Sequence, residues 1–148
     1  MTLLDQINED MKEAMKNRES FKLNVIRMLK GAIQLEKINK KKELSDDEII
    51  SVVNKQIKMR KDSIAEFSKA NRDDLVKQNE AEIEVLTKYM PPQLSEEEVN
   101  KIIDDAFAIV NPTSMKDMGK IMKEISPKLN GKADMGQVNM LVKSRLGN

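Results

Sequence analysis

The chain has 148 residues, which is enough for one compact domain or two small ones with a buried core. It contains no cysteine and no histidine, and this composition excludes disulfide bonds, thiolate or imidazole catalysis and the usual zinc ligand sets. The 26 basic residues nearly cancel the 25 acidic ones, so any affinity for a polyanion must come from local clustering of charge.

The ends and the apolar runs of the chain give an expectation about its compartment. The first ten residues lack a basic leader region, and no apolar run approaches the length of a membrane span. The absence of cysteine fits a reducing compartment. We therefore expect a soluble cytoplasmic protein with no membrane contact.

Helix-start patterns recur along the chain, whereas no segment shows the strict alternation typical of a β-strand. Capping boxes at 45–48 and 95–98 predict two helix starts, because the serine hydroxyl and the glutamate carboxylate satisfy each other's backbone amides. Weaker starts lie at Thr2, Asn71, Ser114 and Asp134. The sequence predicts an all-α fold with helices near 2–16, 19–40, 45–69, 72–89, 95–109, 114–125 and 134–146.

Two helices are expected to organise the N-terminal part. The second has a broad apolar arc, which predicts a central position with contacts on more than one side. Its members are Val25, Ile26, Met28, Leu29, Ala32, Ile33 and Leu35. The third is long, and its apolar residues recur at helical spacings, as expected for a helix laid across the others. They are Ile49, Val53, Ile57, Ile64 and Phe67.

A pair of prolines, Pro91 and Pro92, divides the chain, since proline cannot continue a helix and holds the residue before it extended. The sequence predicts an N-terminal helical domain of about four helices over 1–92. A small three-helix C-terminal domain is expected over 93–148. A piece of that size is only marginally stable on its own.

The usual chemical motifs do not appear. Acidic triplets at 46–48 and 96–98 lie in first helical turns, where capping and the helix dipole explain them better than a metal ion does. Gly119-Lys120 and Gly131-Lys132 resemble fragments of a phosphate loop but lack its other residues and its leading strand. The 11 methionines fall mostly at core positions, although methionine can also line a peptide groove. We predict no catalytic residue, no metal site and no cofactor.

Basic residues are concentrated near the C-terminus, where seven oppose three acidic residues. The seven are Lys116, Lys120, Lys123, Lys128, Lys132, Lys143 and Arg145. At about 100° per residue the first three share one helical stripe, which makes this set a candidate nucleic-acid surface. A second basic surface is possible on Arg27, Lys30, Gln34 and Lys37, extended by 40–42. The alternative for both is an ordinary solvated face. Because aromatic residues are few, any RNA contact would depend on backbone and shape.

The runs 119–123, 131–134 and 138–142 resemble the closing segment of the B subunit of the glutamine-dependent aspartyl/glutamyl-tRNA amidotransferase. Together with 89–97 and 23–30, they make essentially the whole chain resemble the GatB/YqeY family, and its free-standing YqeY branch most. The resemblance implies about four N-terminal helices and a three-helix tail. It also implies that the corresponding regions help to hold tRNA, while chemistry occurs in a body domain with no counterpart here. Asp134 departs from the asparagine usual in the amidotransferase subunit, so kinship to a carbon–nitrogen ligase with glutamine as amide donor does not demonstrate that chemistry.

We therefore expect a non-catalytic helical module that binds tRNA or another structured RNA, in association with an amidotransferase or a tRNA synthetase. An adaptor that docks a partner helix in apolar grooves between the two domains is the alternative. An amidotransferase-type enzyme in its own right is a third reading, for which catalytic groups are missing. The RNA reading predicts a contiguous basic face, whereas the adaptor reading predicts an exposed Met/Leu patch.

Overall fold

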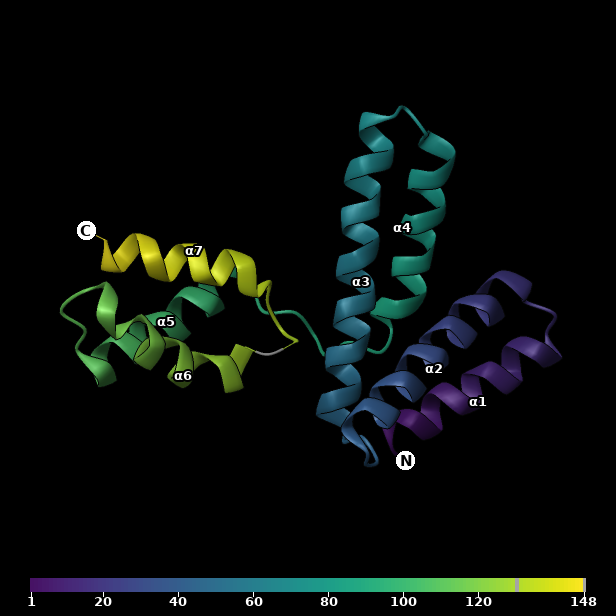
Figure 1. Ribbon diagram of the computed structural model, residues 1–148, viewed down its shortest axis with the longest axis horizontal. Helices are drawn as coiled ribbons and strands as arrows, with labels where there is room; N and C mark the ends of the chain where they lie inside the picture. The colour runs from purple at the N-terminus through teal and green to yellow at the C-terminus, as the bar shows by residue number, and fades with distance from the viewer. Residues whose placement is uncertain (130, 148) are drawn as a thin grey trace. The chain divides into compact units, whose positions relative to one another are not determined.

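The computed structural model describes residues 1–129 and 131–147, and every regular element in these ranges is helical (Figure 1). The predicted all-α fold is confirmed. The α-helices are α1 Leu3–Lys16, α2 Ser20–Lys40, α3 Asp46–Lys69, α4 Asp73–Thr87, α5 Glu96–Val110, α6 Met118–Leu129 and α7 Met135–Leu146, with a 3₁₀ turn η1 at Met115–Asp117. None of the helices in the described ranges combines the length and the apolar character needed to cross a bilayer.

Local capping explains most of the helix starts. Both predicted capping boxes form, with the Glu48 amide 3.2 Å from Ser45 Oγ and the Glu98 amide 3.1 Å from Ser95 Oγ. A third box forms at Thr2. The predicted start at Asn71 is wrong: this residue has a φ of 56° in the turn before α4, a left-handed conformation that asparagine tolerates well.

The first compact unit, Met1–Met90, contains α1 to α4. Helices α1 and α2 form one hairpin and α3 and α4 form another (Figure 1). As expected, α2 is central, because it contacts each of the other three helices and buries Val25, Ile26 and Leu29. The apolar arc is covered only in part, since Met28 and Leu35 remain exposed. The neighbouring helices cover only one side of the arc.

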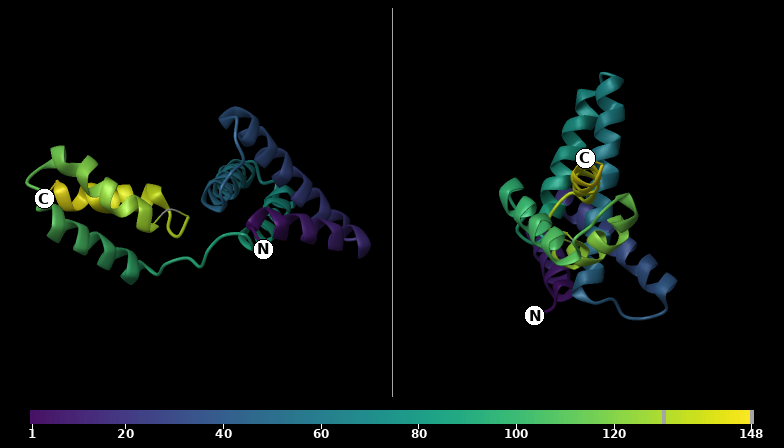
Figure 2. Two further views of the ribbon diagram at one scale, coloured as in Figure 1. Left: turned by 90° about the horizontal axis from the view of Figure 1, so that it is seen from below. Right: turned by 90° about the vertical axis from the view of Figure 1, so that its left-hand side faces the viewer.

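The second compact unit, Pro91–Asn148, contains α5, η1, α6 and α7, drawn in green to yellow in Figure 2. These helices have an apolar core of their own. Helix α6 differs from the predicted span 114–125: it begins after η1 and continues through Pro127 to Leu129. Proline removes only one hydrogen bond of the last turn, and the fully buried Leu129 side chain holds that turn on the core. The exact domain boundary at 92/93 remains a prediction.

Candidate nucleic-acid interface

The basic stripe of the C-terminal unit lies on the outer side of η1 and α6. Lys116, Lys120 and Lys123 are all exposed. The opposite side of α6 has Ile121 and Ile125 with no exposed surface, so packing against α5 and α7 fixes the rotation of the helix. This arrangement points the three ammonium groups away from the core, where they can meet an anion in solution.

A carboxylate at the start of this stripe is already engaged. Asp117 accepts a hydrogen bond of 2.8 Å from the Thr113 amide, and this bond lowers the pKa of the carboxyl group below its usual value. The other oxygen of Asp117 lies 3.6 Å from Lys120 Nζ. Lys120 is nevertheless 73% exposed, so its ammonium group can exchange this contact for another anion. Within the described ranges, Lys116 and Lys123 form no ion pair.

The remaining lysines extend the basic region over the loop and α7. Lys128 lies in the last turn of α6, Lys132 in the loop before α7, and Lys143 in α7; all three are exposed and without an ion pair in the part of the chain that the structure describes. The Lys132 amide donates to the Leu129 carbonyl at 2.9 Å, and the Lys132 carbonyl accepts from the Leu94 amide at the same distance. The backbone of Lys132 is therefore held in place although its side chain is free.

Gly131 makes this loop possible. Its φ of 75° lies in the left-handed region, which residues with a Cβ atom rarely adopt. The Gly131 carbonyl accepts a hydrogen bond of 2.8 Å from Gln93 Nε2, which ties the loop to the segment before α5. Asp134 then caps α7 by accepting from the amides of Gly136 and Gln137. The loop is thus a well-defined support for Lys132.

Arg145, the seventh predicted residue, is engaged within the unit. Its guanidinium group forms an ion pair with Asp104, lies 3.5 Å from Asn100 Oδ1, and stacks 5.7 Å from the ring centre of Phe107. All three partners are on α5, so Arg145 connects α7 to α5. Its side chain is only 31% exposed. The sequence did not indicate this role, because the partners are distant in the chain.

The rival basic surface is paired with acidic side chains only at the C-terminal end of α2, since Arg27 and Lys30 form no ion pair among the described residues. Lys37 pairs with Glu43 at 2.7 Å. Glu48 receives Lys40 Nζ at 2.9 Å and Lys42 Nζ at 3.2 Å. The hydrogen bond from Lys40, followed by that from the Ser45 amide, lowers the pKa of Glu48 to about 2. Among the lysines at this end of α2, Lys41 alone lacks an ion pair within residues 1–129 and 131–147.

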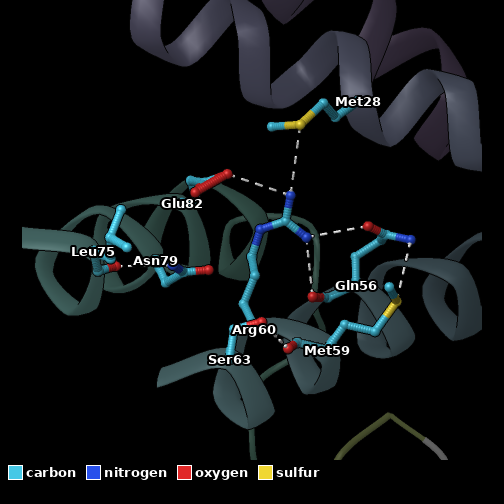
Figure 3. Close-up of polar contacts among 8 residues, drawn as sticks. All are labelled: Met28, Gln56, Met59, Arg60, Ser63, Leu75, Asn79 and Glu82. Carbon is cyan, nitrogen blue, oxygen red and sulfur yellow. Dashed lines mark hydrogen bonds and ion pairs between the residues drawn. The ribbon is translucent and has the colours of Figure 1, made fainter. Parts of the chain in front are cut away.

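Two polar clusters, each around a buried carboxylate, lie in the N-terminal unit. In the first, Arg60 donates to the carbonyl and side-chain oxygens of Gln56 at 3.1 Å and pairs with Glu82 at 3.5 Å (Figure 3). In the second, Asp10 accepts hydrogen bonds from Tyr89 at 2.7 Å and Lys88 at 3.1 Å. Burial raises the pKa of Asp10, but the hydrogen bonds from Tyr89 and Lys88 lower it by more, so the pKa lies below its usual value. Both clusters join helices across the unit, and in the described residues no group of three or more acidic side chains is placed to hold a metal ion.

A groove of about 600 Å³ lies within the C-terminal unit, between the start of α5, the 131–134 loop and α7. Leu94, Val99, Val138 and Leu141 line it, and Glu96, Lys132 and Asp134 stand at its edge. The charges at its edge are of both signs. Of the seven predicted basic residues, Lys132 is the one that lines this groove.

The sequence model of the family described as Yqey-like protein matches residues 4–146. A relative in Pyrenophora tritici-repentis, named Altered inheritance of mitochondria protein 41, mitochondrial, is 31% identical over 137 residues, which are 88% of this chain and 73% of that protein. Proteins of the same name from Lachancea thermotolerans and Saccharomyces cerevisiae are 36% and 35% identical over 64% of this chain. These matches span only 52% and 55% of the two relatives.

The expected cytoplasmic location is contradicted by these comparisons, because the matching relatives are named as mitochondrial proteins. The expectation depended on the lack of cysteine and of a long apolar run. Neither feature distinguishes one disulfide-poor compartment from another, so the composition of the chain was not sufficient evidence for its location.

Proposed function

The chain belongs to the family described as Yqey-like protein, and from this premise we propose that it binds tRNA or another structured RNA through the lysines of its C-terminal unit, without a catalytic reaction of its own. The proposed surface consists of Lys116, Lys120, Lys123, Lys128, Lys132 and Lys143. The partner that would use this binding is an amidotransferase or a tRNA synthetase. The lack of histidine and cysteine supports a role in binding rather than in catalysis.

The observation that supports this proposal most is the contrast between the two basic regions. In the C-terminal unit, only Lys120 of the six lysines has an acidic neighbour within 4 Å among the described residues, and that contact is exposed. In the rival region, Lys37, Lys40 and Lys42 have acidic partners, whereas Arg27, Lys30 and Lys41 have none among the described residues. When a lysine without a partner contacts a phosphate, counterions bound to the RNA are released, and this release favours binding. A paired lysine must first give up its ion pair.

The mode of recognition follows from what the surface lacks. Phe107 is the one aromatic residue of the C-terminal unit, and Arg145 covers it. A stacking platform for unpaired bases is therefore missing from the described part of this unit. Successive lysines one helical turn apart, such as Lys120 and Lys123, suit contacts with the phosphates of a folded RNA, which is recognised by its backbone and shape.

The test replaces Lys120 and Lys123 with alanine in the full chain and measures fluorescence anisotropy with folded tRNA at several salt concentrations. We expect weaker binding and a slope of log affinity against log salt that is lower by roughly one for each phosphate that no longer meets a lysine. Helicity and melting temperature should not change, because both side chains are exposed. The matched control replaces Lys37 and Lys41 on the rival surface.

Two results would overturn the proposal. If the wild-type protein binds tRNA no better than unstructured RNA of the same length, the interaction is general electrostatic attraction. If the Lys37 and Lys41 variant loses affinity while the Lys120 and Lys123 variant retains it, RNA binds at α2 instead. A third measurement, a pull-down from extract with and without RNase, identifies whether protein partners depend on RNA.

A further inference from the structure

Helix α2 has an exposed apolar line at heptad spacing. Phe21, Met28 and Leu35 follow one another at intervals of seven, and Asn24, Gly31 and Ile38 follow each of them by three. We call these six residues the α2 seam. The four apolar side chains are exposed by 45%, 47%, 60% and 60% in chain order. Single exposed apolar residues are ordinary, but a continuous line of four marks an interaction surface.

The seam is distinct from the face that α2 uses inside its own unit. Val25, Leu29 and Ile33 are buried against the neighbouring helices. From Phe21 to Ile38 the seam extends about 26 Å, which is the length of an 18-residue helix. This spacing of apolar residues is the one that lets a second helix pack along the first, each side chain inserting between residues of its neighbour.

Gly31, at the middle of the seam, has no role in the packing of its own unit. A Cβ atom built on Gly31 meets nothing within 4 Å. Glycine inside a helix destabilises it by roughly 0.5–1 kcal/mol relative to alanine, and no close contact within the unit requires it here. On an exposed helix face, glycine does allow the backbone of a second helix to approach closely.

Met28 contacts the Arg60 cluster beneath the seam. Arg60 Nη2 lies 4.0 Å from Met28 Sδ, while the same guanidinium group is held by Gln56 and Glu82 (Figure 3). The side chain of Arg60 is only 12% exposed, so this support does not move freely. The seam therefore has one contact, through Met28, with the polar cluster beneath it.

One edge of the seam is basic. Arg27, Gln34 and Lys41 precede the heptad positions and are all exposed. Neither Arg27 nor Lys41 has an ion pair in the described part of the chain. We infer that the α2 seam binds an amphipathic helix of another protein, with an apolar stripe for the seam and acidic residues beside it for Arg27 and Lys41. This surface and the lysines of the C-terminal unit belong to different helices, so the inference is independent of RNA binding.

A second copy of this chain and an RNA are the two other possible occupants of the seam, and both fit it less well. A second copy packed antiparallel along the seam would place Phe21 of one copy beside Ile38 of the other and Arg27 near Gln34, so Arg27 would gain no acidic partner. RNA would have to cover four apolar side chains that offer its phosphates no donor. An acidic amphipathic helix satisfies both the apolar line and the basic edge.

The test uses two synthetic 18-residue helical peptides, one with leucine at the heptad positions and glutamate beside them, the other with lysine in place of each glutamate. Binding to the full chain is measured by fluorescence anisotropy. We expect the glutamate peptide to bind at least about tenfold more tightly than the lysine peptide. Replacing Arg27 and Lys41 with glutamate should reverse this preference.

Leu35→Glu tests the apolar contact, since glutamate preserves helix propensity but places a charge in the seam. It should weaken binding of the glutamate peptide at least about tenfold. The control is Ile109→Glu on α5, which changes a side chain of similar exposure, 63%, outside the seam. Circular dichroism verifies that both variants are folded, and Leu35→Gln repeats the test without the added charge.

Each contrary result identifies a different error. Equal binding of the two peptides, or binding unchanged by both Leu35 variants, means that the seam is not the site. A wild-type dimer in sedimentation that Leu35→Glu converts to a monomer means that the seam joins two copies. Loss of tRNA binding in Leu35→Glu, with folding intact, means that α2 contacts RNA. Failure of tRNA binding in the wild type leaves the peptide result unaffected, so the two proposals can fail separately.

Discussion

Replacing Leu29 with alanine should strongly destabilise the N-terminal unit. Leu29 is only 1% exposed and lies in the core between α2 and its neighbours. The substitution removes three carbon atoms, worth about 2.4 kcal/mol at about 0.8 kcal/mol for each buried carbon. The remaining cavity adds to this loss, because a packed core closes only in part around it. We expect a total of about 3–5 kcal/mol.

The matched control is Leu35→Ala, which removes the same atoms from the same helix at a position that is 60% exposed. Helix propensity changes equally in both variants, so their difference isolates burial. Exposed substitutions usually change the free energy of unfolding by less than about 0.5 kcal/mol, and we expect Leu35→Ala to remain near that limit.

Urea unfolding monitored by tyrosine fluorescence gives the measurement. The chain has one tyrosine and no tryptophan, and Tyr89 is 3% exposed in the core of the N-terminal unit, so its emission reports on that unit alone. Equal shifts of the urea midpoint for Leu29→Ala and Leu35→Ala would refute the reasoning. They would mean that α2 buries a different face in solution, and that the seam is not an open surface.

Two further predictions concern the polar core and the junction between the units. Tyr89→Phe should cost about 1.5–3 kcal/mol at neutral pH, because the buried Asp10 carboxylate loses a hydrogen bond of 2.7 Å. The pKa of Asp10 is below its ordinary value of 3.8, so the stability from this carboxylate is present above that value and is lost as the pH falls through the lowered pKa. The urea midpoints of wild type and variant, followed by circular dichroism, should therefore approach each other as the pH is lowered below 3.8. Limited proteolysis should cut first near 88–94, since a segment without regular structure opens more easily than a core helix. Early cleavage within 49–67 would contradict this division of the chain.

Helix limits were predictable wherever local chemistry sets them. The capping boxes at Ser45 and Ser95 place the starts of α3 and α5 within one residue of the predicted positions, because hydroxyl, amide and carboxylate are only three residues apart. The end of α6 was not predictable in this way. The burial of Leu129 overrides the tendency of Pro127 to end the helix, and that burial depends on α5 and α7.

The sequence also could not show which side of α2 would remain exposed. The apolar arc of α2 is wide enough to be buried on two sides, and periodicity cannot say how many neighbours will cover it. The structure covers Leu29 and leaves Met28 and Leu35 open. A broad arc on one helix is thus compatible with a central helix and with an exposed apolar face, and α2 has both features.

For the basic surface, the sequence identifies the lysines but not their partners. The contact of Lys40 with Glu36 follows from a spacing of four on one helix and could have been expected. The contacts of Lys40 and Lys42 with Glu48 bring the end of α2 to the start of α3, and that of Arg145 with Asp104 brings α7 to α5. Only the fold reveals which cations remain available.

The distribution of charge within the C-terminal unit also determines how an RNA could approach it. Helix α5 is acidic, with a triplet at 96–98 and a pair at 104–105 against Lys101 alone, whereas the chain from 116 to 145 is basic. Asp104 is occupied by Arg145, but the triplet at the start of α5 is exposed. A polyanion is therefore repelled by one end of α5 while the lysines of α6, the loop and α7 attract it. If the proposed RNA binding holds, this opposition would orient the RNA before any specific contact forms, because long-range fields act during encounter, and the effect would be strongest at low salt.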